Sequence, residues 1–91
     1  DGARRFIIDF SGGDLAFHLN QPEKVEIVPS ISNGRIDRAF IVPNRKTEGF
    51  RAFFDIVVEP GQLADLRAYL RSGDKALTET WTYPWRAPEP A

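Results

Sequence analysis

The stretch GFRAFFDIVVE, residues 49–59, decides the fold class of this chain. Its apolar and charged residues alternate, with Phe50, Ala52, Phe54, Ile56 and Val58 on one parity and Arg51, Asp55 and Glu59 on the other. Successive side chains of a β-strand point to opposite faces of the sheet, whereas a helix repeats every 3.6 residues. The alternation therefore predicts a strand with one face in a hydrophobic core and the other in solvent.

The same alternation recurs on both sides of this stretch, in short runs separated by Gly and Pro. It predicts strands at residues 4–10, 24–32, 35–42 and 76–85, and a short strand around Leu15 and Phe17. Asn33-Gly34 predicts a type I′ hairpin turn between the second and third of these runs. Residues 62–71 fit either a helix or a strand, and the surrounding β pattern favours a strand. Pairing is expected to fade at Pro84, which cannot donate to a ladder.

Six or seven short strands in 91 residues indicate an all-β, antiparallel sandwich of the immunoglobulin-like (E-set) class. The chain has no cysteine, so no disulfide supports it. We expect residues 1–91 to form a single domain, with 87–91 as a frayed tail. The absence of methionine suggests a processed or excised piece of a larger protein. The expected core residues are Phe6, Ile8, Phe54, Ile56, Leu66, Leu70 and Trp81.

Composition excludes several classes of function. A net charge of −1 argues against a nucleic-acid partner, and no apolar run approaches the roughly 20 residues of a membrane span. The single histidine, His18, has no second ligand at metal-binding spacing, so we predict a surface histidine, no metal site and no cofactor. Gly12-Gly13-Asp14 is interpreted as a turn, because no helix is expected after it to complete a phosphate cradle.

Paired carboxylates would be the chemistry of a glycan-cleaving enzyme. Asp9, Asp55 and Asp65 fall on solvent-facing parities of different predicted strands, and a flat sheet face offers no cleft between them. We therefore predict no catalytic residue. Two charged residues, Arg38 and Glu79, interrupt inward-facing parities, which predicts rim positions or a bulge near Glu79.

Aromatic side chains are concentrated in the last predicted strand, where Trp81, Tyr83 and Trp85 share one face. Trp81 and Tyr83 are expected in the core, whereas Trp85 lies beyond Pro84 and is expected to be exposed. Aromatic rings stack on sugar faces and dominate protein interfaces. The candidate contact surface, for another domain or for glucan, is therefore Tyr83, Trp85 and Arg86.

Both ends of the chain carry more specific motifs. The segment RRFIIDF at residues 4–10, followed by Gly12-Gly13-Asp14-Leu15, resembles the start of the C-terminal domain of the periplasmic glucans biosynthesis protein family (MdoG/OpgG/OpgD). The closing stretch, DLRAYLR at 65–71, Gly73-Asp74, LTETWTY at 77–83 and Trp85, resembles the end of the same domain. Residues 33–51 keep the strand–turn–strand layout of the family, so the resemblance covers residues 4–86.

Members of this family are larger exported proteins, in which an N-terminal β-sandwich domain that handles glucan precedes a smaller immunoglobulin-like domain. The resemblance implies a periplasmic, non-catalytic accessory domain in the biosynthesis of osmoregulated periplasmic glucans, which are β-glucans. This domain would pack on and support the N-terminal domain of the same chain. The parent protein would be a β-glucan-active glycoside hydrolase in some members. Two alternatives stay open: an autonomous carbohydrate-binding module and a protein–protein interaction module.

Overall fold

A computed structural model describes residues 3–89 of the chain. Two 3₁₀ helices, η1 (Gly13–His18) and η2 (Pro22–Lys24), separate the first strand from the rest. The strands are β1 (Ala3–Ser11), β2 (Glu26–Ile31), β3 (Arg35–Asn44), β4 (Gly49–Val57), β5 (Leu63–Ser72), β6 (Lys75–Ala76) and β7 (Trp81–Arg86). Within this part of the chain, no helix is long and apolar enough to cross a membrane.

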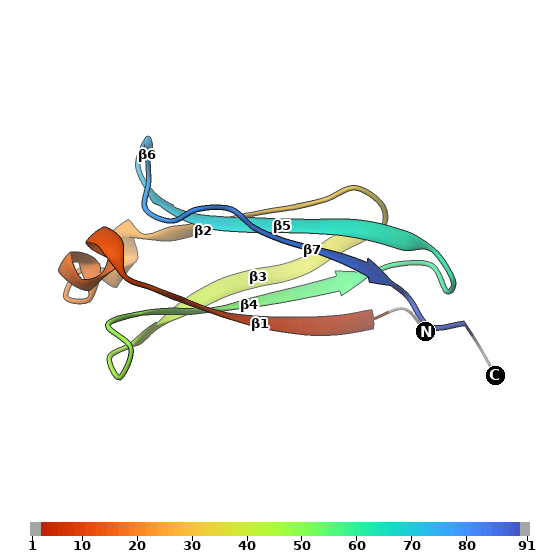
Figure 1. Ribbon diagram of the computed structural model, residues 1–91, viewed down its shortest axis with the longest axis horizontal. Coiled ribbons are helices and arrows are strands. Elements are labelled where there is room, and N and C mark those ends of the chain that lie inside the picture. The colour runs from red at the N-terminus through yellow and green to blue at the C-terminus, as the bar shows by residue number, and fades with distance from the viewer. Residues whose placement is uncertain (1–2, 90–91) are drawn as a thin grey trace.

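The strands form two antiparallel sheets. Sheet A has the order β1-β4-β3, and sheet B has the order β2-β5-β6, with β7 also paired to β5. The sheets lie one above the other in Figure 1, with β1 and β7 on the side nearest the viewer. The predicted all-β, immunoglobulin-like sandwich without a disulfide is confirmed.

The core between the sheets comes mainly from the two central strands, β4 and β5. The inward residues of β4 and the residue after it are at most 1% exposed: Phe50, Ala52, Phe54, Ile56 and Val58. Those of β5 are fully buried: Ala64, Leu66, Ala68 and Leu70. The strand prediction for residues 62–71 is thus confirmed, because only a period of two buries every second residue here. Phe6 and Trp81, expected in the core, pack against it but are only partly buried.

The predicted Asn33-Gly34 hairpin is wrong. β2 pairs with β5 and β3 pairs with β4, so the loop between β2 and β3 crosses from sheet B to sheet A. Ser32 and Asn33 hold this loop on β5. The Asp65 amide donates to the Ser32 hydroxyl at 2.8 Å, and the Asn33 side-chain amide donates to the Leu63 carbonyl at 3.3 Å. Asn33-Gly34 is compatible with either connection, because Gly34 has a positive φ here and a type I′ hairpin turn also needs one.

A β-bulge in β3 reverses the parity predicted for this strand. The register with β4 shifts between Ile36 and Arg38, which leaves Asp37 as the extra residue. Ile36, Ala39 and Ile41 then face the core, whereas Phe40 and Val42, predicted inward, face outward. The bulge also removes Arg38 from the interior. Without the bulge, Arg38 would share the inward face of Ile36, and burying its charge without a partner would be costly.

The predicted final strand is divided in two. Residues 77–80 are irregular and separate β6 from β7, so Glu79 occupies no ladder position. Pairing does not fade at Pro84, because β7 pairs with β5 as far as Arg86. Pro84 is accommodated because β7 lies at an edge of the sheet.

Two end segments also differ from expectation. Residues around Leu15 and Phe17 form η1 and not a strand, so a short helix, absent from the prediction, does begin at Gly13. Ala87, predicted to fray, is 1% exposed and its backbone bonds both Gln62 and Gly61 at 2.9 Å. The part of the predicted tail at residues 90–91 lies outside the described residues.

Candidate functional site

An aromatic cluster occupies one long side of the sandwich, where edge strand β1 of sheet A faces edge strand β7 of sheet B. Phe6 lies at its centre, with ring centroids 6.2 Å from Trp81 and 5.7 Å from both Tyr83 and Trp85. The Arg4 guanidinium lies 5.6 Å from the ring centroid of Trp85. We call this side, with Phe6, Trp81, Tyr83 and Trp85, the β1–β7 seam.

The structure reverses the exposure predicted for the aromatic residues of the seam. Trp85 is buried, at 8% exposure, and Tyr83 is 46% exposed. Trp85 stays inside because β7 remains paired with β5 at this position, opposite Ala64. Tyr83 contacts Phe6 and lies on the solvent-exposed side of the seam. Arg86 is exposed, and its guanidinium donates to the Gly61 carbonyl at 2.7 Å.

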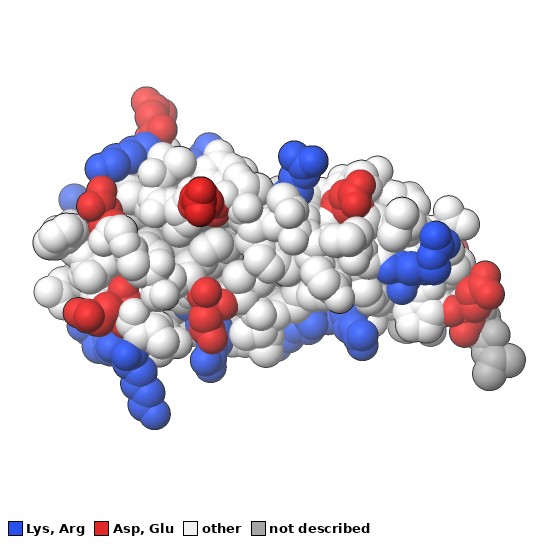
Figure 2. Space-filling view, viewed as in Figure 1, with Lys and Arg blue, Asp and Glu red and all other residues white. Residues whose placement is uncertain are grey.

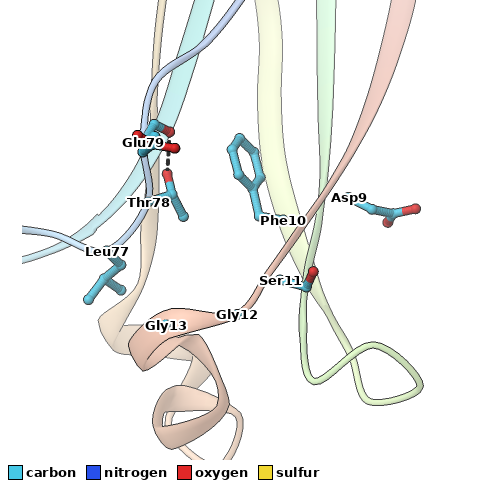
Figure 3. Close-up of a pocket in the computed structure, with 8 residues that line it drawn as sticks. All are labelled: Asp9, Phe10, Ser11, Gly12, Gly13, Leu77, Thr78 and Glu79. Carbon is cyan, nitrogen blue, oxygen red and sulfur yellow. Dashed lines mark hydrogen bonds between the residues drawn. The ribbon is translucent and has the colours of Figure 1, made fainter.

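A pocket of about 440 Å³ lies at one end of the seam, lined by residues 9–13 and 77–79 (Figure 3). The Phe10 ring extends into the space between β1 and the 77–79 segment, whereas Asp9 points away from that segment. The Thr78 hydroxyl accepts from the Leu70 amide at 3.1 Å and donates to the Glu79 carbonyl oxygen at 2.9 Å. The Glu79 carboxylate is exposed and bonds no other described residue. We call this the seam pocket.

The aspartates considered as catalytic candidates are held in ion pairs on the outer face of sheet A. Arg5 donates to both oxygens of Asp55 at 2.7 and 2.8 Å, and Arg51 does the same to Asp9 at 2.8 and 3.2 Å. These hydrogen bonds hold the pKa of each aspartate below its ordinary value. Neither carboxyl group is therefore available as a proton donor near neutral pH.

The third candidate, Asp65, and the histidine occupy different parts of the molecule. Asp65 is exposed on β5 of the opposite sheet, where its backbone anchors the 32–34 loop. His18 Nδ1 lies 3.0 Å from the Asp14 carbonyl oxygen at the end of η1. Among residues 3–89, no group of three His, Cys, Asp or Glu side chains is arranged to hold a metal ion.

The outer face of sheet A carries a second feature, which sequence reasoning missed. The register aligns Ile7, Phe53 and Phe40 in one row across β1, β4 and β3. Val42 lies one rung further along β3, opposite Arg51, and is 40% exposed, while Ile7 is 57% exposed. We call Ile7, Phe40, Val42 and Phe53 the outer row. The apolar residues Phe40 and Val42 were visible in the sequence, but the alternation placed them on the inward face. The bulge in β3 turns them outward, and the alternation does not reveal that bulge.

Comparison with known proteins identifies the family. The family model described as "Periplasmic glucan biosynthesis protein, MdoG" matches residues 1–85. The chain belongs to this family. Glucans biosynthesis protein D of Xanthomonas axonopodis pv. citri is 43% identical over 90 residues, which are 96% of this chain and 17% of that relative. The protein of the same name from Stenotrophomonas maltophilia strain K279a is 44% identical over 86 residues, 92% of this chain and 16% of the relative.

The resemblance seen in the end motifs is thus confirmed for nearly the whole chain. The chain spans about one sixth of the length of the curated MdoG-family relatives that it matches. The family description is that of a periplasmic protein of glucan biosynthesis.

Proposed function

We propose that this chain is a non-catalytic accessory domain of a periplasmic protein of glucan biosynthesis. It packs on, and supports, the larger glucan-handling part of the same polypeptide. The observation that carries this proposal is the outer row, an apolar strip on an exposed sheet face. The chain spans only about one sixth of the length of its relatives, which leaves a larger part that this strip could contact. Contiguous exposed apolar surface of this kind is characteristic of interfaces.

The geometry of the outer row suits a protein partner better than a sugar. Phe40 and Phe53 are stacked on each other, with centroids 4.7 Å apart and planes 10° apart. The Arg38 guanidinium lies 4.5 Å from the Phe40 centroid, and Arg5 lies 5.5 Å from that of Phe53. The two guanidinium groups cover ring faces that a pyranose would need for stacking. Side-chain packing from a protein surface needs no free ring face.

The charged residues beside the outer row give the face a defined polarity. The Arg5–Asp55 pair and Arg38 lie on one side of it, and the Asp9–Arg51 pair lies on the other. The first group therefore has one cation in excess, whereas the second is neutral. A partner surface with an apolar centre and an acidic side chain facing Arg38 would complement this face.

Hydroxyl-radical footprinting with mass spectrometry tests the proposal. The side chains of Ile7, Phe40 and Phe53 should be oxidised in the 91-residue chain and protected severalfold in the full product of the gene that encodes it. Phe17, 81% exposed on η1, is the matched control and should be oxidised equally in both. Equal oxidation of the outer row in both proteins, or a gene product that contains only these residues, would overturn the proposal.

A further inference from the structure

We infer that the β1–β7 seam and its pocket form a binding surface for a short β-linked glucan oligosaccharide. The inference rests on the proposed function for the class of ligand, because it takes the parent protein to handle glucan. The surface itself is defined by the structure. It is distinct from the outer row, which lies on the outer face of sheet A, whereas the seam lies where the two sheets meet.

The aromatic part of the surface is a pair of neighbouring rings. Trp81 and Tyr83 lie with centroids 5.9 Å apart and planes only 17° apart, and both contact Phe6. Phe6 therefore supports the two rings from below, while Tyr83 remains 46% exposed. No described cation lies over Tyr83 or Trp81, in contrast to the guanidinium over Phe40 in the outer row. Ordered, near-parallel aromatic rings of this kind accept the C–H face of a sugar.

The polar part of the surface is the seam pocket. The Glu79 carboxylate has no partner among the described residues, so both oxygens can accept hydrogen bonds from sugar hydroxyls. The Phe10 ring, which extends between the two walls of the pocket, provides an apolar floor (Figure 3). Small-ligand sites combine apolar lining with a few polar groups in this way.

The two parts are continuous along the seam. Phe6 of β1 contacts residues 81, 83 and 85, and residues 9–13, which follow it, line the pocket with residues 77–79. From Phe6 in the aromatic part to Phe10 in the pocket, strand β1 covers about 13 Å, at roughly 3.3 Å per residue. The surface is thus longer than one pyranose ring and suits an oligosaccharide.

The charge on this side of the molecule fits a neutral ligand. Figure 2, which views the seam side, shows a largely uncharged surface with isolated acidic and basic side chains. No cluster of basic residues is present there to select a phosphate or sulfate group. The visible surface therefore offers no cationic site for a phosphorylated or sulfated ligand, and a neutral sugar chain needs none.

Titration of the ¹⁵N-labelled 91-residue chain with β-linked glucohexaoses of 1,2, 1,3, 1,4 and 1,6 linkage tests the inference by NMR. With at least one hexaose, we expect saturable shifts at millimolar concentration, centred on residues 77–83 and the Trp81 indole. Tyr83→Ser should weaken binding about tenfold, which corresponds to 1.4 kcal/mol. Glu79→Gln, which removes the charged acceptor, should weaken it severalfold.

Phe17→Ser and Glu23→Gln are matched controls, because both residues are exposed on the 3₁₀ helices and neither lines the seam pocket. Both control variants should bind like the unaltered chain. The inference is overturned if none of the hexaoses shifts the seam, if the shifts centre on the outer row, or if Tyr83→Ser binds unchanged. Sugar binding without protection of the outer row in the footprinting experiment would support the seam and refute the docking proposal, so the two can fail separately.

Discussion

Replacing Trp85 or Tyr83 by alanine tests directly which of these two aromatic residues of β7 is buried. The two residues lie two positions apart on one strand, yet Trp85 is 8% exposed and Tyr83 is 46% exposed. Trp85 packs edge-to-face on Phe6 with centroids 5.7 Å apart and planes 81° apart, within a buried cluster that includes Phe54 and Leu66. Removing it leaves a large cavity at the end of the core.

The expected loss for Trp85→Ala is about 3–5 kcal/mol of unfolding free energy, the range for a buried large aromatic residue. In a domain of this size each kcal/mol lowers the melting temperature by roughly 4–8 °C, so the decrease is about 12 °C or more. Tyr83→Ala removes a side chain that is already half in solvent and should cost about 1 kcal/mol. Phe17→Ala, at 81% exposure, should stay within about 0.5 kcal/mol of the unaltered chain.

Thermal unfolding followed by far-UV circular dichroism measures all three variants. If Trp85→Ala proves too unstable to fold, Trp85→Phe retains part of the apolar volume and should still melt below Tyr83→Ala. A larger loss of stability for Tyr83→Ala than for both Trp85 variants would show that Tyr83, and not Trp85, is the buried aromatic residue of β7. That result would refute the described seam.

Three further predictions address the sheets. Hydrogen bonds from Arg51 lower the pKa of Asp9, so this pair stabilises the fold above about pH 4. The contribution is lost as the pH falls through the lowered pKa. The difference in unfolding free energy between the unaltered chain and Asp9→Asn should therefore shrink from pH 6 to pH 2 in urea titrations. Gly49→Ala should destabilise β4 strongly in the same assay, because a Cβ there would overlap the backbone carbonyl oxygen of Phe10 in β1. Ile41→Ala should cost more than Val42→Ala, since the bulge turns Ile41 inward; the reverse order in chemical denaturation would contradict the bulge.

Much of the fold could be predicted because the central strands obey a strict period of two. Residues 49–59 and 62–71 lie between neighbours on both sides, so the apolar residues at even-numbered positions are all buried and no local irregularity shifts the pattern. The family could be predicted because the end motifs, which lie largely in β1, β5 and β7, resemble it. Edge positions were less predictable. β3 absorbs an extra residue at Asp37, and β7 tolerates Pro84, because an edge strand has a free side.

The candidate sites illustrate the same division. Tyr83 and Arg86 were predicted as contact residues and are exposed, although Tyr83 was also expected in the core. Trp85 was predicted exposed and is buried. Glu79 was noticed only as an interruption of a strand, although the structure places it in the seam pocket. The outer row was not predicted, because its four residues come from three strands and align only through the ladder register.

The amino-acid sequence by itself determined the all-β class, the inward residues of β4 and β5, and membership of the MdoG family. These follow from alternation and local motifs, which need no knowledge of which strand lies beside which. The tertiary structure alone decided that the Asn33-Gly34 loop crosses between the sheets, that Phe40 faces solvent, and that Phe6 lies beneath Tyr83. Those features depend on long-range pairing and on one inserted residue, and a single-residue shift of register exchanges the two faces of a strand.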